Sequence, residues 1–90
     1  MDKTDPAWKN YAQELGINIA RVRTAKGYFE NRVVADVGLS RFTYWKLERR
    51  ESNPDTPANP RLRSILAVTQ ALDVELADQL PKHIPDLRRR

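Results

Sequence analysis

The sequence predicts an all-α fold, a compact bundle of about five short helices. Several segments carry apolar residues at spacings of three and four, the period of a helix that buries one face. Six prolines and three glycines help to divide the chain between these segments. A chain of 90 residues fits one domain with one small core. We therefore expect a single domain over residues 1–80, followed by a basic, mobile C-terminal tail over residues 81–90.

The first helix is expected to begin at Asp5-Pro6 and to end at Lys26-Gly27. Asp is a favoured N-cap, Pro fits the first helical position, and Lys-Gly is typical of a helix end. Gly16 costs about 1 kcal/mol relative to Ala, so the segment is either one helix or two. For the aromatic residues Trp8 and Tyr11, packing against the core is favoured over a partner surface. The residues of the apolar stripe are Trp8, Ala12, Leu15, Ile19 and Val22.

The residue types of positions 29–37 fit either a helix or a strand. Val33, Val34 and Val37 have helical spacing, but β-branched residues also suit a strand. Gly38 follows and predicts a turn.

Ser40 is a good N-cap for a helix over residues 41–50. Tyr44 and Leu47 share one side of this helix, which we expect to face the core. If the helix were rotated from this phase, two of the aromatics on the other side would be buried instead, namely Phe42 and Trp45. The opposite side and its flanks hold Arg41, Phe42, Trp45, Lys46 and Arg49.

Residues 51–60 predict a loop, because they contain Pro54, Pro57 and Pro60 together with Asn and Asp. A further helix is expected from about Arg61 to Leu72, followed by one short helical turn before Pro81. The longer helix has a broad apolar face, made by Leu62, Ile65, Leu66, Ala67, Val68, Ala71 and Leu72. The apolar residues of the short turn are Val74, Leu76 and Leu80.

The charge pattern indicates a polyanion as a partner. The chain has 16 Lys and Arg against 12 Asp and Glu, a formal charge of +4. Residues 21–50 hold eight Lys and Arg against three Asp and Glu, a charge of +5 within one segment. Such a block is typical of a nucleic-acid site, although a solvated helix face would look the same.

Two short helices joined at Gly38, the second with exposed cations and aromatics, predict a helix-turn-helix. From Leu15 to Leu80 the order of residues resembles the phage-repressor and Cro-type helix-turn-helix family, often called XRE. The resemblance implies a lambda-repressor-like fold. It also implies sequence-specific binding of double-stranded DNA by a transcriptional regulator. The matching pieces are Leu15-Gly16, Ile19, Arg23-x-x-Lys26-Gly27, Val33-x-x-x-Val37-Gly38-Leu39-Ser40-Arg41-x-Thr43-Tyr44-x-x-Leu47-Glu48-Arg49, Asn53-Pro54, Leu62-x-x-Ile65 and Ala71-Leu72-x-Val74-x-Leu76.

The resemblance also implies the DNA-binding residues. Arg41 could bond guanine O6 and N7, Lys46 the same acceptors or a phosphate, and Phe42 a thymine methyl. Arg50 is a candidate for the DNA backbone, and Arg61 and Arg63 are candidates for a phosphate or the minor groove. Arg23 and Glu48 match a structural ion pair of the family. The complete candidate set is Ser40, Arg41, Phe42, Trp45, Lys46, Arg49, Arg50, Asn31, Arg61 and Arg63.

The sequence departs from the family pattern in three places. Phe29 and Glu30 stand where the family usually has Ser-Gln, and a phosphate would repel the Glu30 carboxylate, although Asn31 could donate instead. Val34 replaces a small residue where two helices approach each other. The Pro-rich segment over residues 51–60 is longer than usual, so it either contacts DNA or a partner, or is a tolerated insertion.

We expect a cytoplasmic homodimer that binds double-stranded DNA, with no cofactor, metal, membrane partner or catalytic activity. The chain has no cysteine, no apolar run of about 18 residues, and no His or Asp arrangement that would activate a serine. Leu76, Leu80 and the tail are the expected dimer surface. The alternatives are an antitoxin-like or other protein-interaction module, and a helix-turn-helix that has lost DNA binding, which Glu30 would explain.

Overall fold

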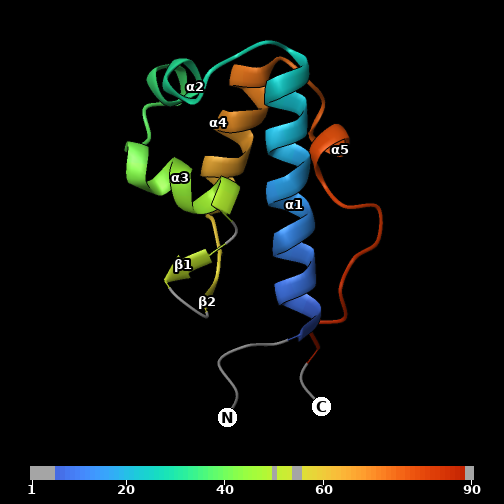
Figure 1. Cartoon of the computed structure of the whole chain (residues 1–90). Helices are drawn as coiled ribbons and strands as arrows, with labels where there is room; N and C mark the ends of the chain where they lie inside the picture. The colour runs from blue at the N-terminus through green and yellow to red at the C-terminus, as the bar shows by residue number, and fades with distance from the viewer. Residues whose placement is uncertain (1–5, 50, 54–55, 89–90) are drawn as a thin grey trace.

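A computed structural model describes residues 6–49, 51–53 and 56–88 of the chain (Figure 1). The described residues confirm the all-α class, since helices make up nearly all of their regular structure. The elements in chain order are α1 (Pro6–Ala25), α2 (Glu30–Val37), α3 (Arg41–Arg49), β1 (Glu51–Asn53), β2 (Thr56–Pro57), α4 (Leu62–Leu72) and α5 (Leu76–Gln79).

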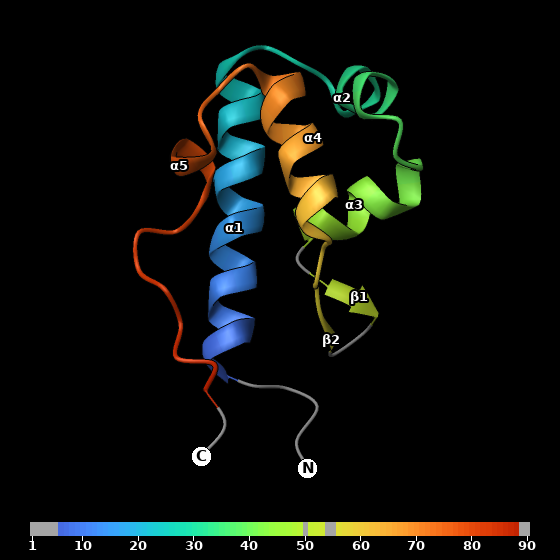
Figure 2. The same ribbon diagram turned by 180° about the vertical axis from the view of Figure 1, so that it is seen from behind.

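Helix α1 is one continuous helix of 20 residues, so Gly16 does not divide it. Its apolar stripe buries Leu15 and Ile19 in the core, and the predicted N-cap Asp5 lies outside the described residues. Helices α1 and α4 run in the same direction, and α2 and α3 lie to one side of them (Figures 1 and 2).

Residues 30–37 form a helix, which resolves the ambiguity left by the valines. Helix α2 packs on α4, where Val33 is fully buried and Val34 and Val37 are half-buried. Burial of this valine face outweighs the weak local preference for a strand. Gly38 ends the helix with a φ of 71°, and its N–H donates to the carbonyl of Val34 at 3.2 Å. A left-handed backbone of this kind favours glycine.

The hydrophobic core draws side chains from four helices, and it fixes α3 through two of its residues, Tyr44 and Leu47. Because these two side chains are buried, the opposite face of α3 is held at the surface in a defined rotation. The buried core residues are Leu15, Ile19, Val33, Tyr44, Leu47, Ile65, Val68 and Leu72.

Two parts of the sequence prediction were wrong. The expected loop over residues 51–60 contains a short antiparallel pair, with Glu51 opposite Pro57 and Asn53 opposite Thr56, and Pro54 lies outside the described residues. Proline is tolerated in such a ladder because an edge strand does not need every N–H. The apolar face expected for α4 was also too broad. Leu62 and Leu66 are exposed.

The segment after β2 packs against the N-terminal half of α1. The indole Nε1 of Trp8 donates to the carbonyl of Ala58 at 3.0 Å, and Ala58 is buried. Trp8 stacks on Tyr11 with 5.7 Å between ring centroids, and Tyr11 is buried. The expectation that these aromatics pack within the domain is confirmed, and their packing holds the long α3–α4 connection against the domain.

Helix α5 closes the other side of α1. Gln79 is fully buried, its Nε2 donates to Thr69 Oγ1, and its backbone carbonyl accepts a hydrogen bond from Asn18 Nδ2 at 2.8 Å. Leu76 and Leu80, the expected dimer residues, are half-buried against the core. From α5 the described chain runs back beside α1 toward the N-terminal end of that helix (Figures 1 and 2).

Candidate nucleic-acid interface

The turn between α2 and α3 is built as the sequence predicts. The backbone N–H of Thr43 donates to Ser40 Oγ at 3.0 Å, so Ser40 caps the start of α3. The Ser40 hydroxyl in turn donates to Thr43 Oγ1 at 2.8 Å. Leu39 packs against the core inside the turn, whereas Ser40 is exposed. The capped end of α3 is therefore open to a ligand.

Helix α3 has two chemically different faces. Tyr44, Leu47 and Glu48 are buried on the inner face. On the outer face Phe42 is 63% exposed and Trp45 is 40% exposed, which excludes the rotated helix that would have buried them. Arg41 and Arg49 are also exposed there, and Lys46 is half-buried.

The side chains of the outer face are ordered by contacts with one another. The rings of Phe42 and Trp45 stack with centroids 6.1 Å apart and planes 11° apart. Lys46 Nζ lies 4.8 Å from the centroid of Phe42, and Arg49 Cζ lies 5.3 Å from that of Trp45. An exposed cation–π contact contributes about 0.5–1 kcal/mol, so each cation is held beside a ring. The result is an apolar strip with positive charge at its border.

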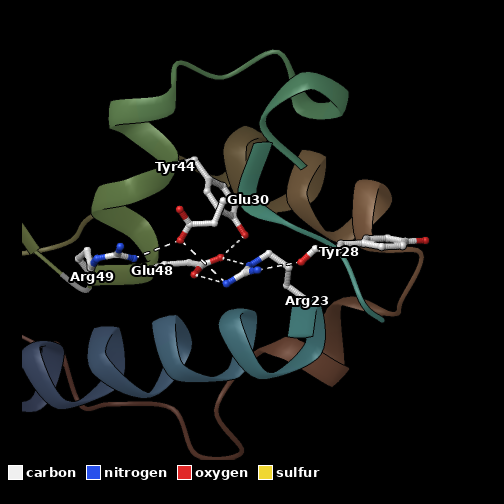
Figure 3. Close-up of polar contacts among 6 residues, drawn as sticks. All are labelled: Arg23, Tyr28, Glu30, Tyr44, Glu48 and Arg49. Atoms are coloured by element: carbon white, nitrogen blue, oxygen red, sulfur yellow. Dashed lines mark hydrogen bonds and ion pairs between the residues drawn. The ribbon is translucent and has the colours of Figure 1, made fainter. Parts of the chain in front are cut away.

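A buried ion pair holds α3 to α1 (Figure 3). Arg23 Nε donates to Glu48 Oε2 at 2.6 Å, and Arg23 Nη2 donates to Glu48 Oε1 at 3.1 Å. The Tyr44 hydroxyl donates to the same carboxylate, and Arg23 Nη1 donates to the carbonyl of Tyr28 at 2.8 Å. The Arg23–Glu48 pair expected from the resemblance is confirmed, and it fixes the buried face of α3 on α1.

The contacts within this ion pair favour the charged forms of both Arg23 and Glu48. Burial raises the pKa of Glu48, but hydrogen bonds from Arg23 and Tyr44 outweigh burial and hold that pKa below its ordinary value. The hydrogen bond to Glu48 raises the pKa of Arg23. Burial and the hydrogen bond to Glu48 raise the pKa of Tyr44 well above its ordinary value. Glu48 is therefore ionised at neutral pH, although its side chain is only 3% exposed.

Glu30 has a role that the sequence analysis missed. Its Oε2 accepts a hydrogen bond from Arg49 Nη1 at 3.2 Å and lies 3.9 Å from Arg23 Nη2 (Figure 3). The carboxylate that the sequence suggested would repel phosphate is therefore paired with two guanidinium groups of the protein. Glu30 and Arg49 are 19 positions apart, so no helical spacing revealed the pair. The available signal was the replacement of the family's Gln by Glu.

The remaining candidate residues fall in different places. Lys46 and Arg61 line one hollow of about 410 Å³ between α3 and the start of α4, with Thr43 and Ser64. Arg63 instead lines a separate hollow beside α2, so the structure does not bring it to Lys46. Asn31 is exposed on α2, and Arg50 lies outside the described residues.

Two negative observations concern the described residues. They contain no group of three or more His, Cys, Asp or Glu side chains placed to hold a metal ion. Within the same part of the chain, no helix has both the length and the apolar character needed to cross a bilayer.

The capped turn between α2 and α3, the buried inner face of α3 and the packing on α1 and α4 define a lambda-repressor-like helix-turn-helix protein. Among solved structures, the chain is similar to the restriction-modification controller protein C.AhdI from Aeromonas hydrophila. The TM-score is 0.66 and the identity 28%, and the match covers 77% of this chain and 96% of that chain. No family model matches the chain, and no curated protein matches its sequence. The structural match confirms the resemblance to phage-repressor and Cro-type proteins.

Proposed function

We propose that this chain is a transcriptional regulator that binds double-stranded DNA with α3 in the major groove. The observation that carries the proposal is the outer face of α3, where Arg41, Phe42, Trp45 and Arg49 are exposed beside a capped helix start. A recognition helix needs this combination of a buried packing side and an exposed polar and aromatic side. The similarity to a controller protein supports the same function.

Arg41 and Lys46 are the proposed contacts to base edges. Arg41 is exposed on the first turn of α3, the part of a recognition helix that enters the groove. A bidentate Arg–guanine contact contributes about 1–3 kcal/mol of discrimination. Lys46 borders the hollow next to Arg61, so the two cations together suit a base edge and a neighbouring phosphate.

The proposed contacts to the DNA backbone are Ser40, Asn31, Arg49, Arg50 and the two arginines of the α4 segment, Arg61 and Arg63. Phosphate contacts set the register and give most of the salt dependence, whereas base contacts set the sequence preference. We propose that residues 1–80 form the DNA-binding domain and that the basic residues of the tail add non-specific attraction. A homodimer would place two copies of α3 on half-sites about 34–36 Å apart.

The experiment is selection of tight binders from random duplexes, followed by fluorescence anisotropy at several salt concentrations. A palindromic consensus with half-sites one helical turn apart would support the homodimer. Arg41→Ala should weaken binding of the consensus by about 1–3 kcal/mol and relax one base position. Arg21→Ala is the matched control, because Arg21 is exposed on α1 and, among the described residues, donates a hydrogen bond to Asn18 of the same helix. Equal loss in both variants would contradict the proposed role of α3.

A protein-interaction module is the second candidate. Ile17 on α1 and Ile84 and Leu87 in the segment after α5 are exposed apolar side chains, which favours a protein partner. Under this function alone, binding to duplexes would be weak and unselective, and no consensus would emerge from the selection. A defined consensus with a steep salt dependence would exclude this second function as the sole one.

A further inference from the structure

The stacked pair of Phe42 and Trp45 is chemically unusual for a surface that faces a polyanion. Both rings are exposed, and their centroids are 6.1 Å apart with nearly parallel planes. Phosphates and most base edges offer an aromatic ring only polar or charged groups. Among the groups that the four base pairs present in the major groove, the C5-methyl of thymine is the apolar one.

From this pair we infer that α3 reads the C5-methyl groups of pyrimidines, and that 5-methylcytosine is recognised as well as thymine. This inference rests on the proposed DNA-binding function. Cytosine and thymine present different polar groups, but a methyl group at C5 has the same position on both rings. An apolar strip made by two stacked rings contacts that methyl and makes no use of the neighbouring polar group.

The width and the border of the strip make the inference more specific. Ring centroids 6.1 Å apart span more than one base step, since steps are about 3.4 Å apart along one strand. The two rings therefore face more than one base pair. Lys46 Nζ lies over the Phe42 ring at 4.8 Å, so a donor for guanine O6 and N7 stands directly beside the apolar strip. The favoured target is a methyl-bearing pyrimidine next to a guanine.

The expected size of the effect follows from the area that a methyl group buries. Removing one CH₂-sized group from water contributes about 0.8 kcal/mol, which is about fourfold in a binding constant. Each methyl that lies on the strip should therefore change affinity about fourfold.

The test uses the full chain and its tightest selected duplex, with fluorescence anisotropy as the readout. Each thymine is replaced in turn by uracil, which lacks the methyl but keeps the base pair, and each cytosine by 5-methylcytosine. We expect a loss of about fourfold at one or more thymines, and at such a position a 5-methylcytosine–guanine pair should bind about fourfold more tightly than a cytosine–guanine pair. Equal affinity for these two pairs overturns the inference. In the variants Phe42→Ala and Trp45→Ala these methyl effects should shrink to less than about twofold, and circular dichroism should show both variants folded.

Phe29→Ala is the matched control, because Phe29 is an 81% exposed phenylalanine at the start of α2. The methyl effects should persist in this variant. The inference is overturned if the selected duplex binds but no methyl changes affinity by more than about twofold, and this outcome leaves the proposed function intact. It is also overturned if the methyl effects survive in both Phe42→Ala and Trp45→Ala. If no duplex binds selectively, the proposed function fails, and this inference with it.

Discussion

Replacing Arg23 with methionine is expected to destabilise the fold by about 3–5 kcal/mol, because it leaves a buried carboxylate without its cation. Arg23 donates two hydrogen bonds to Glu48, at 2.6 and 3.1 Å, and the Glu48 side chain is 3% exposed. After the substitution, the Tyr44 hydroxyl remains as a neutral donor to this carboxylate. Methionine keeps most of the apolar stem of Arg23, so the loss reports mainly the charge and its hydrogen bonds.

The expected loss is large for a domain of this size. Typical stabilities of about 0.05–0.15 kcal/mol per residue give roughly 5–13 kcal/mol for 90 residues. At about 4–8 °C per kcal/mol, a loss of 3 kcal/mol lowers Tm by at least about 12 °C. Urea denaturation followed by circular dichroism measures the free energy of unfolding directly.

The control and the second variant make this prediction refutable. Arg21→Met, on the exposed side of the same helix, should change stability by less than about 0.5 kcal/mol. Adding Glu48→Gln to Arg23→Met removes the stranded charge and keeps an acceptor for Tyr44. The double variant should therefore regain at least about 1 kcal/mol. If Arg23→Met costs no more than Arg21→Met, then Glu48 does not depend on the guanidinium and the reasoning is refuted.

Three further predictions concern Glu30, Gly38 and Glu48. Glu30→Gln should strengthen duplex binding and steepen its salt dependence by up to about 0.9 in log–log slope, because Arg49, a proposed phosphate contact, no longer shares its charge with the Glu30 carboxylate; an unchanged affinity and slope in anisotropy titrations would contradict this. Gly38→Ala should cost about 1 kcal/mol in urea denaturation and Gly38→Asn less, because the φ of 71° is the obstacle and an added Cβ meets nothing within 4 Å. The low pKa of Glu48 stabilises the fold above the ordinary carboxylate pKa of about 4.3, and this contribution is lost as pH falls through the lower folded value. The acid limb of a stability–pH curve should accordingly flatten in Glu48→Gln, and an unchanged limb would assign the acid sensitivity to other groups.

Local sequence signals predicted the elements that depend on local chemistry. Ser40 as the cap of α3, Gly38 as the end of α2 and the division of α3 into buried and exposed faces all follow from residue type and helical spacing. The Arg23–Glu48 pair came from the resemblance, because a distance of 25 positions has no local signature.

Long-range contacts explain what the sequence did not predict. Residues 30–37 are helical because their valines pack on α4, which no local preference could decide. The hydrogen bond from Trp8 to Ala58 joins residues 50 positions apart, so the sequence indicated that Trp8 packs on the domain but not which segment receives it. Leu62 and Leu66 have the spacing of core residues, yet no other element of the described residues covers them, and both are exposed.

Helix α1 packs against segments that lie far from it in the chain. Its partners are α3, β2 and α5, and the hydrogen bond from Asn18 to Gln79 joins positions 61 apart. Most of the stability of a helix within a protein comes from the packing of its apolar face rather than from local propensity. Loss of α3 would therefore expose Leu15 and Ile19 to water, so we expect the domain to unfold in one cooperative transition rather than helix by helix.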